Sequence, residues 1–270
     1  PRTLSLEAVD IGQGDALLMR VPGGDATLID TGLTPYSARR LARVLSRRGV
    51  REPLHLVVTH PHGDHAGGWS TLARLRPLAS TAIAATAGGP EDWEPYVPRE
   101  LAARATPLVR GAAWNRGGAA FSVRWPPVPL GLPDPNMVSA VLRVRWRDRE
   151  LWLMGDALQI QERDLLDLGE PGAGPFHRLL KVGHHGSRRA SDPAWIAALR
   201  PVVAVIPAGR HNRFEHPHPE TLEALAAAGL PAPWITGPCA GVRVAAVPGG
   251  WAMETGDGGT MVPIDGYQPE

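Results

Sequence analysis

The chain has 270 residues, 43% of them hydrophobic, which is enough to bury the core of one large domain. Its formal net charge of +1 excludes a nucleic-acid binder that relies on overall positive charge, so affinity for phosphate must come from local patches or bound metal. The single cysteine, Cys239, excludes an internal disulfide, and no stretch is long and apolar enough to span a bilayer. Because the chain begins with Pro1 and shows no secretory signal, we expect residues 1–270 to be one domain cut from a longer protein.

The first part of the chain predicts short strands and one helix. Apolar runs at residues 4–9, 16–21, 26–29 and 54–59 are typical of strands. Thr34 and Pro35 predict the start of a helix, as N-cap and first helical residue, and Gly49 predicts its end.

The second part predicts a similar alternation of strands and helices. We expect short strands and irregular connections over 82–135, a strand pair at 138–146 and 150–154, and further strands at 179–182, 202–206, 242–247 and 251–254. Helices are expected up to about residue 168 and over 191–199 and 221–228. This pattern fits an α/β fold with two sheets packed face to face and helices outside.

Three histidines and one aspartate lie within six residues directly after the predicted strand 54–59. His60, His62, Asp64 and His65 carry the imidazole and carboxylate groups that borderline divalent metals prefer. Alternate residues of an extended segment point the same way, so His60 and His62 can share one metal, while Asp64 and His65 can turn with a Gly-rich loop toward a second. A solvated surface loop is the alternative, and the density of ligand residues argues against it.

Two later segments add candidates. Asp156 follows the apolar strand 150–154 and could bridge two metals, or serve only in a turn. His184 and His185 follow another strand and could supply one metal ligand and one hydrogen-bond donor to an anion. The residues expected to hold the ligands in place from outside are Asp15, Asp30 and His216.

Taken in order, these segments resemble the metallo-β-lactamase superfamily. The resemblance is carried by residues 10–15, 28–32, 59–68, 136–139, 155–156, 180–187 and 212–217. The histidine cluster is specific only to the superfamily. The Gly-Gln-Gly-Asp opening, together with His-His-Gly-Ser at 184–187, resembles the C-terminal domain of ComEC-type competence channel proteins, over about residues 4–257.

The resemblance implies an αββα sandwich with the site at one edge of the two sheets. It implies one or two divalent ions, Mn²⁺ or Zn²⁺, with Asp156 between them, and no small organic cofactor. It also implies that one histidine of the pair 184–185 is a ligand, and we assign that role to His185 while His184 stays the alternative. It also implies a membrane protein with this domain outside the cytoplasm, and the channel portion of the same protein as a partner. Two departures from the family stand out: no histidine lies between His65 and His177, where many members have a further ligand, and His62 stands where ComEC relatives often have aspartate.

The function we expect is metal-dependent hydrolysis of phosphodiester bonds in single-stranded DNA, the strand that is not imported. Asp64 would act in catalysis with the metals, while His184, Ser187 or Lys181 would contact phosphate oxygens. The arginines that either steer DNA or form a solvated surface are Arg188, Arg189, Arg210 and Arg213. Two alternatives stay open: hydrolysis of a small ester, thioester or lactam, and a non-catalytic nucleic-acid-binding domain with a degenerate metal site.

Overall fold

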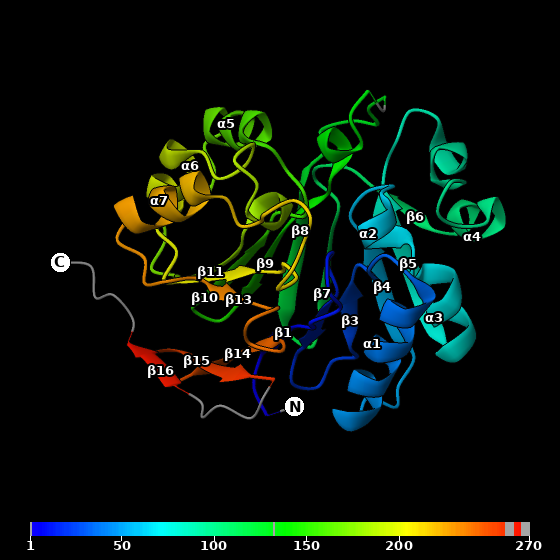
Figure 1. The fold of residues 1–270 in the computed structure, drawn as a ribbon, viewed down its shortest axis with the longest axis horizontal. Coiled ribbons are helices and arrows are strands. Elements are labelled where there is room, and N and C mark those ends of the chain that lie inside the picture. The colour runs from blue at the N-terminus through cyan, green and yellow to red at the C-terminus, as the bar shows by residue number, and fades with distance from the viewer. Residues whose placement is uncertain (1, 132, 257–261, 266–270) are drawn as a thin grey trace.

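Two mixed β-sheets form the centre of this computed structural model, which describes residues 2–131, 133–256 and 262–265 (Figure 1). In spatial order, the first sheet consists of β16 (Val262–Asp265), β15 (Gly250–Thr255), β14 (Val242–Val247), β1 (Ser5–Ala8), β2 (Leu17–Arg20), β3 (Thr27–Ile29), β4 (Leu54–Val58), β5 (Leu78–Ala84) and β6 (Thr106–Leu108). The second consists of β13 (Trp234–Ile235), β12 (Val203–Ile206), β11 (His177–Lys181), β10 (Arg149–Leu153), β9 (Val141–Trp146), β8 (Ala119–Trp125) and β7 (Ala113–Arg116). Strands β3 to β6 and β10 to β13 are parallel, and the other pairs are antiparallel.

Helices cover the outer face of each sheet, as Figure 1 shows. The first sheet is covered by α1 (Pro35–Arg47), α3 (Trp69–Leu75) and α4 (Arg99–Ala103), and the second by α5 (Gln159–Asp167), α6 (Pro193–Leu199) and α7 (Pro219–Ala227). Shorter helical turns are α2 (Gly63–Ala66) and the 3-10 segments η1 (Gly89–Trp93), η2 (Pro135–Val138) and η3 (Gly183–Gly186). Within the described residues, no helix has the length and hydropathy that a bilayer crossing requires.

Three apolar clusters hold these layers together. One lies between the sheets and joins Leu6 and Val244 of the first to Phe121 and Leu142 of the second. The other two fill the space between each sheet and its helices. Because β4 is covered on both faces, its sequence is apolar over nearly its whole length, as is typical of buried parallel strands. The structure thus confirms the expected αββα sandwich.

The main local difference from expectation lies at residues 60–68. Thr34 caps α1 as predicted, since its hydroxyl accepts a hydrogen bond from Ser37 N–H at 3.2 Å. The stretch predicted as a Gly-rich loop instead contains the short helix α2, followed closely by α3. Gly67 has an ordinary φ of −62°, and a Cβ there would overlap the carbonyl oxygen of Leu33. Glycine is therefore needed at this position for close packing.

Candidate metal centre

The candidate ligand residues come together where strands of both sheets end. His60 and His62 follow β4 of the first sheet, and the next helix, α2, carries Asp64 and His65. Asp156 follows β10, and His185 lies in η3 directly after β11, both in the second sheet. The centre therefore lies at an edge that the two sheets share, and each sheet contributes part of it.

Two groups of candidate ligand atoms share Asp156. The first group consists of His60, His62 and Asp156, and the second of Asp64, His65, Asp156 and His185. Within each group the ligand atoms all lie within 4.8 Å of one another. In the second group, Asp156 Oδ1 lies 3.2 Å from His65 Nε2, and Asp156 Oδ2 lies 3.4 Å from His185 Nε2.

Several of these atoms are buried without a hydrogen-bond partner. They are His60 Nε2, His65 Nε2, His185 Nε2 and Asp156 Oδ1. Buried polar atoms are normally satisfied, and unsatisfied imidazole and carboxylate atoms that face one another are suited to a cation. The donor set of this chain therefore fits one or two divalent metal ions.

The charges around the second group favour a cation in it. Burial acts to lower the pKa of His65, but the carboxylates of Asp156 and Asp30 outweigh burial and raise it well above its usual range. His185 behaves in the same way, with Asp156 as the main opposing charge to burial. By contrast, burial and the neighbouring His65 hold the pKa of His60 well below its usual range. A positive charge, as a proton or a metal ion, is therefore stabilised between the carboxylates.

Asp30 orients His65 from outside the cluster. Its Oδ2 atom lies 2.8 Å from His65 Nδ1, and Oδ1 accepts a hydrogen bond from Thr59 N–H at 2.7 Å. Asp30 adopts a left-handed backbone with a φ of 62°. A carboxylate on one ring nitrogen fixes the ring orientation and directs the other nitrogen outward, here toward Asp156.

Lys181 and Asp15 form a fully buried ion pair behind the cluster. The ammonium lies 2.5 Å from Asp15 Oδ2 and donates to the carbonyl oxygen of Gly155 at 2.6 Å. Asp15 Oδ1 in turn lies 3.3 Å from His185 Nδ1, so the pair reaches a candidate ligand. No part of Lys181 is exposed, so its position does not fit the expected contact with phosphate. Its ammonium group instead contacts Asp15 and the residue before Asp156.

His184 and His216 lie beside the cluster, outside both ligand groups. Their ring centroids are 5.7 Å apart. Burial lowers the pKa of His184 against the opposing effect of Asp156, and burial together with His185 lowers the pKa of His216 to about 4. Both rings are therefore neutral at neutral pH. The His184 side chain is 17% exposed, so it can meet a molecule that enters the site.

Ser187 and the two arginines after it form the rim next to His184. Ser187 is only 4% exposed, and its hydroxyl accepts a hydrogen bond from Arg189 N–H at 3.3 Å, so it stabilises its own loop. Arg188 and Arg189 are exposed, and Arg189 pairs with Asp134 at 2.7 Å. Arg189 is therefore partly neutralised, whereas Arg188 has only a 3.7 Å contact, with Glu220.

The remaining two candidate arginines belong to the loop before His216. Arg210 donates to the carbonyl oxygen of Pro238 at 3.2 Å, and the guanidinium of Arg213 lies over the ring of Phe214, 4.8 Å from its centroid. These four arginines border the centre but do not enter it.

Ser139 belongs to the site although its residue type gave no reason to single it out. Its hydroxyl accepts a hydrogen bond from Asp156 N–H at 2.8 Å and lies 3.5 Å from His60 Nδ1. It therefore positions His60 and Asp156, two of the three residues of the first ligand group, from a buried location. The only signal in the sequence was its place in the 136–139 segment.

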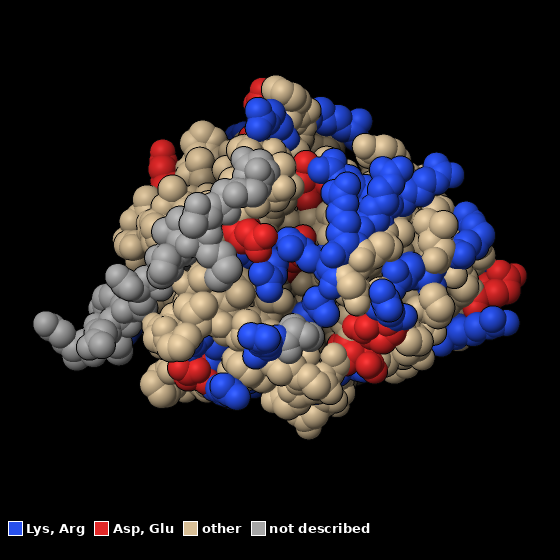
Figure 2. Space-filling model, turned by 90° about the horizontal axis from the view of Figure 1, so that it is seen from below, with Lys and Arg blue, Asp and Glu red and all other residues tan. Residues whose placement is uncertain are grey.

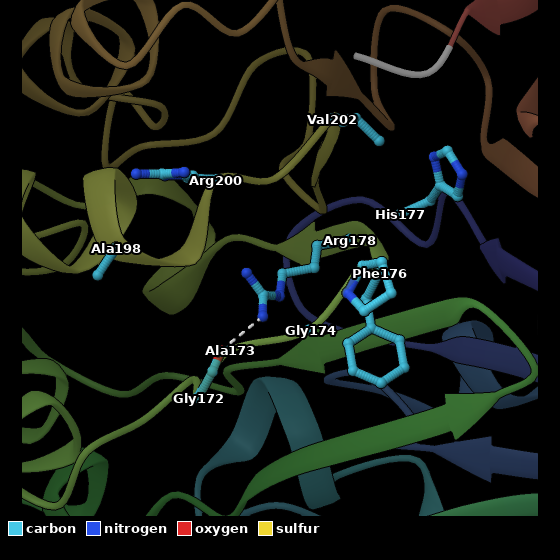
Figure 3. A pocket seen from close by; sticks show the side chains of 10 residues that line it. Gly172, Ala173, Gly174, Phe176, His177, Arg178, Ala198, Arg200 and Val202 are labelled. Atoms are coloured by element: carbon cyan, nitrogen blue, oxygen red, sulfur yellow. Dashed lines mark hydrogen bonds between the residues drawn. The ribbon is translucent and has the colours of Figure 1, made fainter. Parts of the chain in front are cut away.

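A separate cavity of about 620 Å³ opens at the other ends of β11 and β12, away from the candidate metal ligands (Figure 3). Arg178 points into it, but its guanidinium is held by Glu150 at 2.7 Å and by the carbonyl oxygens of Gly172 and Leu199. The described residues that line this cavity do not include any of the groups of candidate metal ligands. Among the described residues, the groups of candidate metal ligands lie at the histidine cluster.

Comparison with known proteins agrees with this geometry. Residues 9–210 match the family model described as the metallo-beta-lactamase superfamily. The chain is 28% identical over 245 residues to ComE operon protein 3 of Bacillus subtilis, and 29% identical over 221 residues to competence protein ComA of Neisseria gonorrhoeae. Each alignment covers 82% of this chain, but only 30% and 29% of those relatives, which are ComEC-type competence proteins.

A third relative is named as a hydrolase and not as a competence protein. Hydroxyacylglutathione hydrolase of Anaeromyxobacter dehalogenans is 30% identical over 226 residues, with 82% of this chain and 77% of the relative covered. The family model spans well over half of the chain. The chain therefore belongs to the metallo-β-lactamase superfamily.

Proposed function

We propose that the chain hydrolyses phosphodiester bonds of DNA in a metal-dependent reaction. The observation that supports this most directly is the pair of ligand groups that share Asp156. In such a site, divalent metal, for which Mn²⁺ and Zn²⁺ are the candidates, supplies an activated water and neutralises charge on a phosphate. His60 and His62 would hold one ion, and the second would lie among the residues Asp64, His65 and His185, with Asp156 common to both.

The protein's own residues would orient the metal ligands and contact the phosphate group of the substrate. Asp30 orients the ring of His65, and the carbonyl oxygen of Pro207, 2.9 Å from Nδ1, together with Asp15 orients the ring of His185, so these ligands lose little freedom when they bind. His184 is neutral and partly exposed next to Asp156, at 3.8 Å. Through its ring N–H it is therefore placed to donate a hydrogen bond to a phosphate oxygen.

DNA is the substrate we propose because the competence-named relatives share this domain. The biological setting would be degradation of the strand that is not imported during DNA uptake. In that setting the chain is part of a membrane protein, faces away from the cytoplasm and contacts the channel portion of the same protein. Arg188, Arg210 and Arg213, on the loops that border the centre, would steer the strand electrostatically.

Hydrolysis of a thioester or another small ester is the second candidate. The similarity to a hydroxyacylglutathione hydrolase, of which 77% is covered, favours it. The two functions would use the same ligand groups, so they differ in what binds beside the metals. A panel of single-stranded DNA, a chromogenic phosphodiester and a glutathione thioester separates them.

The test of the main proposal uses purified protein loaded with Mn²⁺ or Zn²⁺ and end-labelled single-stranded DNA. We expect cleavage that Asp64→Ala lowers at least about 100-fold, because the variant loses a ligand of one group. Asp167→Ala removes an exposed carboxylate at the end of α5 and serves as the matched control. Metal content of each variant is measured by elemental analysis.

Three results would count against the proposal. Equal cleavage by wild type and Asp64→Ala would point to a contaminant. Turnover of the thioester with inert DNA would favour the second candidate. A metal-free protein that still binds DNA would favour a non-catalytic nucleic-acid-binding domain.

A further inference from the structure

A recess of about 540 Å³ lies between α1 and the strands β14 and β15. Figure 2 shows many Lys and Arg side chains gathered on this face of the molecule. The sequence has one lysine, Lys181, which is fully buried, so the positive surface here is made of arginine. Because the whole chain carries a formal charge of only +1, this is a local separation of charge and not an overall excess.

Helical spacing places four exposed or half-exposed side chains on one face of α1. Tyr36, Arg40, Arg43 and Arg47 follow one another at intervals of four, three and four residues, and all four line the recess. The helix has 13 residues and is therefore about 20 Å long. The arginines form a row along it, and Tyr36, which is 60% exposed, stands at its N-terminal end.

The acidic residues of the recess hold some arginines in place and leave others unpaired. Asp10 pairs with Arg40 at 3.0 Å, and Glu254 pairs with Arg243 at 3.0 Å. Glu7 binds Arg48 in the same way, at 2.8 Å. Among the residues that the structure describes, the side chains of Arg43 and Arg47 make no ion pair or hydrogen bond. The recess therefore carries at least two uncompensated positive charges on fixed walls.

The recess continues toward the candidate metal centre. A second hollow, of about 390 Å³, shares Asp10, Tyr36 and Arg40 with the first and extends to Gln13 and Asn212. Asn212 accepts a hydrogen bond from His216 N–H at 2.9 Å, and Gln13 lies two residues before Asp15. One continuous surface thus runs from the arginine row past an exposed aromatic ring to the loops that hold the centre.

We infer that this surface, the α1 track, binds the backbone of a single nucleic-acid strand on its way to the metal centre. Arginine forms bidentate contacts with phosphate, and an exposed aromatic ring can stack on an unpaired base. The arginine row along the roughly 20 Å of α1 is therefore long enough to contact several consecutive phosphates of one strand. A flat anionic membrane fits less well, because the charges line a recess that leads to the site.

The inference deepens the proposed function and rests on it for the statement that the bound strand is a substrate. Binding itself is measured without metal, by the fluorescence anisotropy of a labelled 20-nucleotide oligothymidine in EDTA over a series of salt concentrations. Each phosphate contact contributes about 0.7 to the slope of log affinity against log salt for a single strand. The double variant Arg43→Gln with Arg47→Gln should therefore flatten the slope by about 1.4 and weaken binding at low salt.

Controls separate the track from general charge. Arg104→Gln with Arg200→Gln removes two exposed arginines that lie outside both hollows and should leave the slope unchanged. Tyr36→Ala should weaken binding about tenfold, and Tyr36→Phe should retain it. Melting temperatures of all variants show whether each is folded.

Two outcomes would overturn the inference. One is a wild-type slope in the Arg43/Arg47 double variant. The other is binding to phosphatidylglycerol vesicles or to polyglutamate that depends on the same two arginines and is as strong as binding to the oligonucleotide. Protein that binds through the track but never cleaves with metal would contradict only the proposed function. Protein that cleaves while the double variant keeps the wild-type slope would contradict only this inference.

Discussion

Replacing Lys181 with methionine tests the ion pair beneath the candidate metal centre. Lys181 and Asp15 have side-chain exposures of 0% and 1%, and the ammonium is also bonded to the carbonyl oxygen of Gly155. Methionine fills a similar volume without charge, so the Asp15 carboxylate would remain buried without the ammonium group that lies against it. Removing one partner of a buried pair costs about 3–5 kcal/mol. For a protein of this size the melting temperature would fall by roughly 6–20 °C.

The partner substitution shows whether that loss comes from the stranded charge. Asp15→Asn combined with Lys181→Met removes both charges, and we expect it to recover most of the stability that Lys181→Met loses. Urea unfolding at pH 7 in EDTA, followed by the fluorescence of the nine tryptophans, measures both variants without interference from metal. The exposed Arg104→Gln variant is the control for loss of a positive charge.

The reasoning is refuted if Lys181→Met lies within about 1 kcal/mol of wild type, which is the range of exposed pairs. It is also refuted if the double variant is no more stable than the single one. Either result would free Lys181 for the contact with phosphate that its place in the sequence first indicated. A large loss of stability in Lys181→Met that the double variant recovers would show that Lys181 serves mainly as the buried partner of Asp15.

Two further predictions concern two buried carboxyl groups, those of Asp30 and Glu162. Asp30→Asn keeps a residue type that tolerates the φ of 62° but weakens the hold on His65 Nδ1, so Zn²⁺ affinity should fall about 10- to 100-fold in competition with a fluorescent chelator. The exposed Asp25→Asn is its control, and equal affinities would contradict the role of Asp30. Burial raises the pKa of Glu162 from 4.5 to about 8, so the native state binds this proton more tightly than the unfolded chain does. The resulting contribution to the free energy of unfolding is complete below about pH 4.5 and is lost as the pH rises to about 8. Glu162→Gln should therefore flatten the decline in unfolding free energy between about pH 5 and 8, and parallel urea-melt profiles for the two proteins would disprove this.

The fold was predictable from the sequence wherever the signal was local. Thr34 and Pro35 marked the start of α1 correctly, and the apolar runs marked β1 to β4, β9 to β12, β14 and β15. Strands β5 to β8 were not located individually. Helix α2 was missed because glycine and histidine are weak helix formers, and tertiary contacts decide the backbone there. Gly67 illustrates the reason, since its need for space is set by Leu33, which lies on another segment.

The candidate site was predictable in its residue types and not in its supports. A dense run such as His60 to His65 indicates ligands without any knowledge of distance. The partnership of Lys181 with Asp15 joins residues 166 positions apart, and burial alone distinguishes a support from a substrate contact. The spacing of Tyr36, Arg40, Arg43 and Arg47 was readable in the sequence, but the strands that turn this helix face into a recess are distant in the chain.

The backbone of His184 and His185 is strained, and the same two residues carry imidazole rings of the candidate site. His184 and His185 both adopt left-handed conformations, with φ values of 46° and 54°, which cost about 1–3 kcal/mol each for residues other than glycine. Glycine would relieve that strain, but it would also remove the rings that face Asp156. A chain that keeps histidine at both positions therefore retains this backbone strain together with two imidazole rings beside Asp156.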